Sequence, residues 1–442
     1  MFSSLVLAAR FRVLLAYLLL SCSLASASAA DYFQVIDSAI SADPLLQSQS
    51  KQIKAWQQQA VASEQWQDPK VALSWDNLPV NGFDIHQEAM TQFKVGISQQ
   101  LPRGDTLEIK AAQQRLKGDI VQWQAQNRHF ELSRDVGNHW LMLHLAYTSK
   151  GYLQQSRDMF SKLIEVTRSQ YATGQKRLQD VVRAEVELTR LDLRISQVEG
   201  NIAMLQAGFA RWLPASQNVA LQNQKLPSLN ISPKLLNLTG LALHQQLSKH
   251  PKLQAAQQHI SLSDKNTELA KQRYEPAYAV KASYGLRADA PGGGSGAGSG
   301  GAGRADLFSI GIQFELPIFT DSKQDRQVEA AILTSGAKTL DKVLLLQQMG
   351  ADYYRHKAKL GLLQQQFGLY QDTLIAQLYE QSQTTLSAYN SDLGDFSEVM
   401  SATIDELNGL IALAQIKIQL LQQANNINYL FGHSGHFSQG AL

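Results

Sequence analysis

The sequence FKVGISQQLP, residues 93–102, returns later in the chain as FSIGIQFELP, residues 308–317. Both copies alternate apolar and polar residues before a leucine–proline pair, which is typical of a β-strand with one apolar and one polar face. Proline lacks the N–H that a central strand needs, so it marks the end of such a segment. Two strands of the same kind at distant points of the chain indicate an internal repeat.

Other matched positions show how far this repeat extends. The separation between the two copies is constant over long stretches and then grows in steps. The matched pairs are Pro44 with Pro251 and Pro69 with Pro276, both 207 residues apart, Pro102 with Pro317, 215 apart, and Tyr171 with Tyr389, 218 apart. One structural unit has therefore been used twice.

The repeat predicts the domain organisation. We expect a signal peptide at 1–30, a first repeat at 31–213, a linker at 214–240, a second repeat at 241–432 and a tail at 433–442. Each repeat is expected to contain a helix, a strand pair (about 70–102 and about 277–317) and a long helical hairpin (103–213 and 318–432). Neither hairpin contains a proline, which allows helices far longer than the usual ~12 residues.

The N-terminal segment has the pattern of a secretory leader. Two arginines are its only charges, an apolar run follows them, and small residues precede a cleavage site near Ala29 or Ala30. Loss of these arginines reduces the formal charge from +2 to zero, so no nucleic-acid partner is expected. The single cysteine, Cys22, is open to two interpretations: it is removed with the leader, or it is a lipidation site.

The four strand candidates alternate so that one face of each is apolar. We expect about nine to eleven residues in each, the length of a strand that crosses a bilayer. The apolar sets are Val71, Leu73 and Trp75; Phe93, Val95 and Ile97; Tyr278, Val280, Ala282, Tyr284 and Leu286; and Phe308, Ile310, Ile312, Phe314 and Leu316. Alternation alone fits a soluble sheet equally well. The leader, the lack of a run of ~18 apolar residues after it, and the aromatic residues near the strand ends favour the membrane.

Four strands cannot close a barrel, whose practical minimum is about eight. Unpaired strand edges in lipid cost several kcal/mol for each backbone group. The long helices pose the same problem, because their apolar stripe would extend roughly 100 Å and needs partner helices along its length. The predicted fold is a mixed α and β membrane protein in which a homotrimer completes a 12-stranded barrel that continues into an α-helical barrel.

This pattern resembles the TolC family of outer-membrane efflux channels over nearly the whole mature chain. The resemblance is carried by the strand-to-helix joints LPRGD and LPIFT and by the hairpin ends QYATGQKRLQDVVRAEVEL and AYNSDLGDFSEVMSATIDEL. It implies a trimer in the outer membrane, in contact with its lipid, whose helical part crosses the periplasm toward an adaptor protein and an inner-membrane pump. The segment MTQFKVGISQQLPRGDT is similar to the heavy-metal branch.

The resemblance also implies that the hairpin ends, 174–184 and 392–402, form a periplasmic gate. Gly174 is in addition a natural C-terminal residue for the first long helix. In the family, an acid of the first end bonds a tyrosine of the second, and the matching positions are Asp180 and Tyr389. A second family bond joins a polar residue to an arginine. The matching positions here are Gln179 and Gly394, and glycine has no side chain to form that bond.

One branch of the family places two acidic rings in the constriction. Glu398 matches the first ring, and Ser401 stands where the second acid would be. A ring of carboxylates favours cations. Asp180 and Glu398 also lie in the first turn of a returning helix, where capping is the ordinary role of an acid.

Other functions find little support. The sequence contains no nucleophile elbow, no H-E-x-x-H and no Walker lysine, so no enzyme and no cofactor are predicted. The ten histidines are interpreted as solvated or packed, and no metal site is predicted. The glycines of PGGGSGAGSGGAG, residues 291–303, match G-x-G-x-x-G, but a strand rather than a helix follows them, so we expect a loop. The hypothesis that competes with an outer-membrane channel is that the chain is a periplasmic coiled-coil adaptor with a soluble β-domain.

Overall fold

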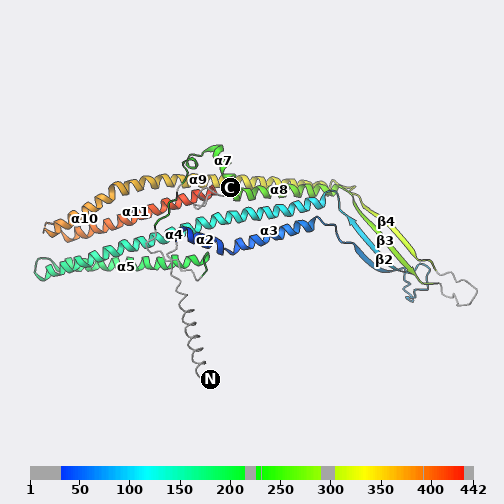
Figure 1. Cartoon of the computed structure of the whole chain (residues 1–442), viewed down its shortest axis with the longest axis horizontal. Coiled ribbons are helices and arrows are strands. Elements are labelled where there is room, and N and C mark those ends of the chain that lie inside the picture. The colour runs from blue at the N-terminus through cyan, green and yellow to red at the C-terminus, as the bar shows by residue number, and fades with distance from the viewer. Residues whose placement is uncertain (1–30, 215–224, 230, 290–303, 392, 433–442) are drawn as a thin grey trace, which may run out of the picture. The chain divides into compact units, whose positions relative to one another are not determined.

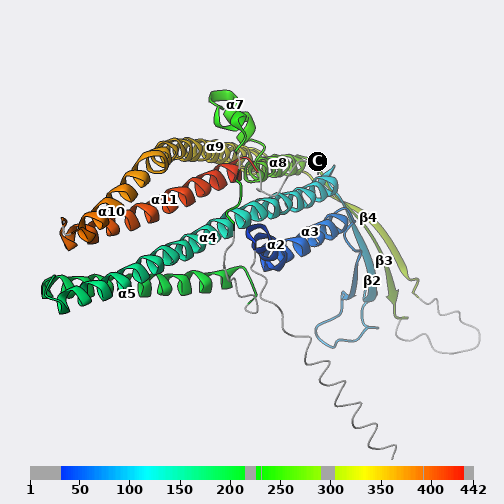
Figure 2. The same cartoon turned by 60° about the vertical axis from the view of Figure 1, so that its left-hand side comes forward.

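The computed structural model describes residues 31–214, 225–229, 231–289, 304–391 and 393–432 (Figure 1, Figure 2). The predicted leader with Cys22, the glycine-rich stretch and the predicted tail lie outside the described residues. The elements are α2 (Tyr32–Ala42), α3 (Pro44–Ser63), β1 (Lys70–Asp76), β2 (Gln92–Leu101), α4 (Thr106–Ala172), α5 (Leu178–Gly208), α6 (Pro233–Leu236), α7 (Gly240–Leu247), α8 (Pro251–Lys271), β3 (Ala277–Arg287), β4 (Leu307–Glu315), α9 (Gln324–Leu369), α10 (Ile375–Asn390) and α11 (Phe396–Leu430), with short 3-10 turns at Phe209–Arg211 and Gln272–Tyr274 and a π-turn at Tyr370–Leu374. In this described part, no helix is both long and apolar enough to cross a bilayer.

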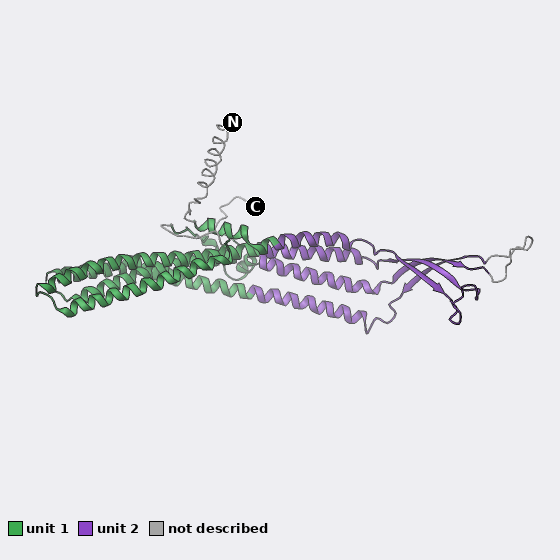
Figure 3. Cartoon of the chain, turned by 90° about the horizontal axis from the view of Figure 1, so that it is seen from below, with its two compact units in different colours: residues 1–47, 126–250, 347–442 green, residues 48–125, 251–346 purple. Residues whose placement is uncertain are grey.

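The chain divides into two compact units, and both draw on both repeats (Figure 3). Unit 1 comprises the described residues up to 47, 126–250 and those from 347 onward; unit 2 comprises 48–125 and 251–346. The two helical hairpin ends belong to unit 1, and all four strands belong to unit 2.

The repeat appears in the structure as two matched series of elements. Pro44 is the first residue of α3 and Pro251 the first of α8, where the missing N–H of proline costs nothing. The helix expected in each repeat is α3 in the first copy and α8 in the second. Pro44 also separates α2 from α3, because the residue before a proline avoids helical conformation and Asp43 is extended. The elements explain part of the growth in separation. β3 has 11 residues where β1 has 7, which accounts for four of the eight residues gained in that interval, and α9 begins seven residues after its proline where α4 begins four after.

Unit 2 contains one antiparallel sheet with the strand order β1-β2-β3-β4. Its pairing registers place the apolar residues of neighbouring strands side by side, for example Leu73 opposite Val95 and Val95 opposite Tyr284. Most of these apolar side chains are exposed. The expected length of nine to eleven residues is wrong for β1, because the ladder ends at Asp76 and Asn77 adopts a left-handed conformation with φ 56°.

Unit 1 has its core where α2, α4, α5 and α11 meet. Trp140 of α4 is fully buried there, and its ring packs edge-on against Tyr32 with centroids 5.3 Å apart. Gly137, one turn before Trp140, lies so close to the Tyr32 hydroxyl that a Cβ would collide with it. The close approach of α2 to α4 therefore depends on a glycine in a helix interior, where glycine is otherwise unfavourable.

A buried ion pair fixes the junction between α2 and α3. The Asp43 carboxylate is 5% exposed, accepts a bond from the Leu46 N–H at 2.8 Å and lies 2.8 Å from the Arg128 guanidinium. Burial raises the pKa of Asp43, but the hydrogen bonds and charge of Arg128 and the helix N–H groups outweigh burial and leave this pKa below its ordinary value. The pair is therefore a stabilising contact above the ordinary pKa of aspartate, and it is lost as pH falls through the lowered pKa.

We predict that Asp43→Asn lowers the free energy of unfolding at neutral pH by about 1.5–3 kcal/mol, the worth of a hydrogen bond to a charged group. It should also flatten the loss of stability between about pH 5 and pH 2. Thermal unfolding of the purified chain, followed by circular dichroism, measures both effects. The matched control is Asp192→Asn, which breaks the exposed pair with Arg157 and should cost less than about 1 kcal/mol. Equal effects of the two variants would contradict this role for Asp43.

Candidate functional site

The first hairpin end is shaped by a glycine. Helix α4 ends at Ala172, and Gly174 follows with φ +78°. The Gln175 N–H donates to the Gln170 carbonyl and the Gly174 N–H donates to the Tyr171 carbonyl, both at 2.9 Å. This is the Schellman pattern, in which a left-handed residue satisfies the last carbonyl groups of a helix.

Asp180 lies in the first turn of the returning helix α5. Its Oδ2 accepts a bond of 3.3 Å from the Arg177 N–H, three residues earlier. This contact caps the helix N-terminus, where a negative charge also interacts favourably with the helix dipole. Gln179 beside it is exposed to solvent.

The second hairpin end is tighter. Asp395 caps α11 by accepting a bond of 3.0 Å from the Ser397 N–H. A Cβ on Gly394 would lie 3.1 Å from the Ala388 Cβ and 3.2 Å from the Tyr389 nitrogen. The loop thus folds back on the last turn of α10 at a distance that disfavours any side chain. This crowding gives a physical reason for glycine at the position where the resemblance leads one to expect arginine.

Tyr389 joins the two hairpin ends within unit 1. It is 1% exposed, its hydroxyl donates to the Gln170 Oε1 at 3.1 Å, and the same hydroxyl lies 3.4 Å from the Thr167 Oγ1. The Lys176 ammonium lies over its ring, 4.4 Å from the centroid. Tyr389 and Phe396 belong to an apolar cluster with residues of α4, α5 and α11.

The structure thus brings Tyr389 to the first hairpin end but gives it other partners than the expected acid. Among the described residues, no hydrogen bond between Asp180 and Tyr389 is present; Gln170, Thr167 and Lys176 occupy the contacts of the tyrosine. Sequence analysis missed these three residues. The place of Lys176, two positions beyond the turn glycine, could have indicated that it lies at the hairpin end. Gln170 and Thr167 lie within a long helix, where nothing in the sequence distinguishes them.

The expected acidic positions lie along one exposed stripe of α11. Glu398 and Ser401 are both exposed, and so is Asp405, which sequence analysis did not single out. Spacings of three and four residues place all three on one helix face. Asp405 follows Glu398 by seven residues, so a second carboxylate is present one turn beyond the serine. The heptad spacing was the signal that could have found it.

Nothing in the described part of the chain groups three or more histidine, cysteine, aspartate or glutamate side chains into a metal site. His139 instead packs in the core of unit 1. Its Nε2 lies 2.7 Å from the Leu205 carbonyl oxygen, and its ring contacts Phe209 and Trp212 edge-on.

The comparisons with known proteins bear on the fold. No family model and no curated protein matches the sequence. Several solved structures match it. The outer membrane protein VceC of Vibrio cholerae matches with a TM-score of 0.72 at 14% identity, over 91% of this chain and 96% of its own. The CmeC outer membrane channel of Campylobacter jejuni matches with a TM-score of 0.71 at 13% sequence identity, over 93% of this chain and 87% of CmeC. CusC, solved in a study of transmembrane channel formation, matches with a TM-score of 0.70 at 16% sequence identity, over 91% of this chain and 92% of CusC.

The chain has the fold of these outer-membrane channel proteins. In each comparison the match covers most of this chain and most of the solved chain, so it includes the helical hairpins as well as the sheet. The fold that the resemblance implied is confirmed at this level.

Proposed function

We propose that the chain forms a homotrimeric outer-membrane channel of a tripartite efflux system. The observation that carries this proposal is the shared fold, which matches several outer-membrane channels over 91% or more of this chain. None of the described elements suggests a catalytic role, and the matched proteins are channels.

The sheet supports a membrane location and a trimer. Its apolar face is exposed, with Phe308, Ile310 and Ile312 each more than 60% exposed in the single chain, which is costly in water and favourable in lipid. Strands β1 and β4 are the outer strands of the sheet, and an open edge is not tolerated in a bilayer. Three copies joined edge to edge would close a barrel of twelve strands with its polar face around water.

The hairpin ends supply a surface for the periplasmic adaptor and, through it, the inner-membrane pump. Leu393 is 86% exposed at the second end, and Tyr171 and Leu178 are exposed at the first. Apolar side chains of this size gain free energy when a partner covers them. They support the proposal that adaptor hairpins bind there.

The same hairpin ends form the proposed gate. Tyr389 holds the second hairpin to the first through Gln170 and Lys176, and Asp180 is the acid that the resemblance assigns to this tyrosine. Glu398, with Asp405 in place of Ser401, lines the constriction with carboxylates. The cargo belongs to one of two classes: heavy-metal cations, as the similarity of residues 90–106 suggests, or drugs and other small molecules.

The arrangement of the strands disfavours the adaptor alternative. An adaptor carries one helical hairpin with its strands grouped outside it. Here two strand pairs alternate in sequence with two helical hairpins, and yet all four strands form one sheet.

We predict that the protein is in the outer-membrane fraction after mild detergent extraction and migrates as a heat-labile trimer on an unheated gel. Loss of the trimer band on heating is expected because the chain, once Cys22 is removed with the leader, has no thiol for covalent linkage. A monomer released from membranes by salt or alkaline wash would contradict the proposal and favour the adaptor.

We further predict that Tyr389→Phe raises single-channel conductance in planar bilayers. Loss of one hydrogen bond, worth about 1 kcal/mol, should increase the ratio of open to closed states about fivefold, and the mean conductance of each channel rises with it. Asp180→Ala should act in the same direction if the acid belongs to the gate. Tyr379→Phe, an exposed tyrosine of α10, is the control. No change in either gate variant would contradict the assignment.

A further inference from the structure

The charged side chains of the sheet are confined to one face. The strands contain six charged residues, and strand alternation with the pairing registers places all of them on the face opposite the apolar residues. They are Lys70, Asp76, Lys94, Lys281, Arg287 and Glu315. This set has four cations and two anions, so the polar face of each chain is basic.

Both acids on this face are already paired. The Asp76 carboxylate lies 3.2 Å from the Lys94 ammonium, and the Glu315 carboxylate lies 2.6 Å from the Arg103 guanidinium. The Arg287 Nε donates to the Ala305 carbonyl at 2.7 Å. The Arg287 guanidinium keeps its charge, but it lies at the loop end of β3, where the Asp306 carboxylate accepts a bond from the Arg287 N–H at 3.1 Å. Away from that end, the strand charges that remain outside an ion pair in the described chain are those of Lys70 and Lys281.

Lys70 and Lys281 are exposed, and within the described part of the chain neither has an ion-pair partner. The pairing register aligns them in one row across the sheet: Lys70 lies opposite Ser98, Ser98 opposite Lys281, and Lys281 opposite Gly311. Two strand spacings separate the lysines, about 10 Å.

The neighbours of the lysines leave the ammonium groups accessible. Ser98 and Gly311, which share their row, have short side chains or none, and the space where a Cβ would lie on Gly311 is open. Two hollows on the polar face, of about 290 and 390 Å³, are both lined by Lys70, Ser98 and Lys281. The smaller is also lined by Asp68 and Glu315, and the larger by the paired Asp76 and Lys94. The long lysine stems therefore extend over a shallow, solvent-filled surface.

We propose that Lys70 and Lys281 form a basic band inside the barrel, near the end where the strands join the helices, that makes the barrel selective for anions over cations. This inference rests on the proposed trimer, in which the band contains six lysines. A barrel of twelve tilted strands is about 24 Å across between backbones, and the lysine stems bring the charges well inside that wall.

The expected strength follows from Coulomb's law. One unit charge about 10 Å away in water changes the local concentration of a monovalent ion by roughly twofold. Several charges around one lumen act together in dilute salt, whereas at about 0.1 M salt the screening length is itself about 10 Å. The preference should therefore be marked in dilute solution and weak in concentrated salt.

The band favours one cargo class over the other. Small organic anions and neutral molecules pass a ring of lysines more readily than free metal cations do, by the same logic that makes lysine rings select anions in pores. The carboxylates of α11 have the opposite charge, so the sheet and the second hairpin end differ in the sign of their exposed charge. The structure thus favours anionic small molecules as the cargo.

Ion permeability measures this directly. The trimer is reconstituted in planar bilayers under a gradient of dilute potassium chloride, and the ratio of chloride to potassium permeability is taken from the reversal potential. We expect the double variant Lys70→Gln, Lys281→Gln to lower this ratio at least roughly twofold. Ser98→Asp, which puts a carboxylate between the two lysines, should lower it without removing either.

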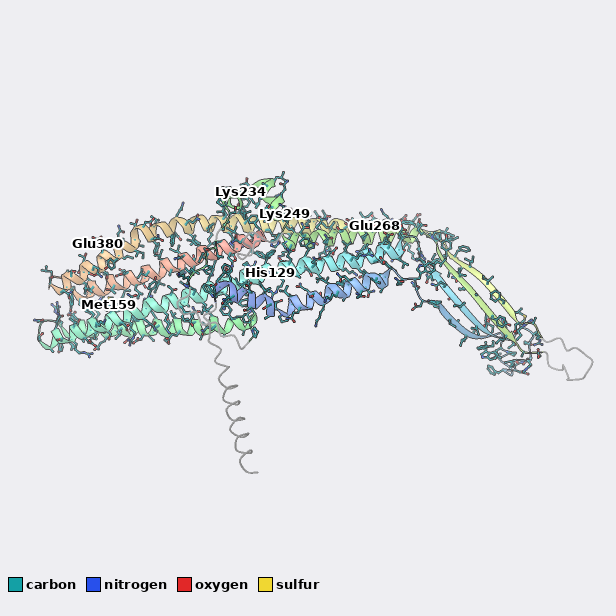
Figure 4. All side chains as sticks on the ribbon, viewed as in Figure 1. His129, Met159, Lys234, Lys249, Glu268 and Glu380 are labelled. Atoms are coloured by element: carbon teal, nitrogen blue, oxygen red, sulfur yellow. The ribbon has the colours of Figure 1, made fainter. Side chains whose placement is uncertain are left out.

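Lys234→Gln is the matched control, since Lys234 is an exposed lysine of α6, outside the sheet (Figure 4). It removes one lysine charge outside the sheet and should leave the ratio unchanged. A trimer that conducts, with the same ratio in the native chain and the sheet variants, would overturn the basic band while leaving the proposed function intact. A preparation with no trimer and no conductance would overturn the proposed function and the band with it.

Discussion

The backbone groups along the outer edges of β1 and β4 set the constraint on which the rest of the structure depends. Within the described chain these edges have no strand partner, and the apolar face between them is exposed. Lipid can cover the face, but it cannot satisfy the N–H and C=O groups of an open edge. Only further copies of the same sheet can do so. The membrane location, the trimer and the water-filled interior that we propose would all meet this one requirement.

In the proposed channel the helical hairpin ends meet a different requirement, because a gate must hold together and still open. Much of each end is built from local contacts: the Schellman turn at Gly174, the cap at Asp395 and the close approach at Gly394. The contact between the two hairpins combines one buried tyrosine and its three polar neighbours with an apolar cluster of α4, α5, α10 and α11. The polar contacts of the tyrosine are the part that can be broken without unfolding either hairpin.

Much of this architecture could be predicted from the sequence, because repetition and alternation are local patterns. The strand faces, the turn at Gly174 and the proline starts of two helices required no knowledge of tertiary contacts. The partners of Tyr389 could not be predicted, since Gln170 and Thr167 have no distinctive local pattern and meet the tyrosine only after both hairpins pack. Gly394 shows the intermediate case: its departure from the resemblance was visible, but the crowding by Ala388 that explains it required the structure.

The most direct test of the central claim is a disulfide scan between the edges of neighbouring copies. In a chain with Cys22 replaced by serine, Ala72→Cys on β1 is combined in turn with Ser309→Cys, Gly311→Cys or Gln313→Cys on β4. Opposed residues of paired strands lie close enough for a disulfide. Closure of the barrel by three copies predicts covalent dimers and trimers with at least one pair, and none when Ala72→Cys is combined with Ser283→Cys on the inner strand β3. Only monomers with all three edge pairs would contradict the account.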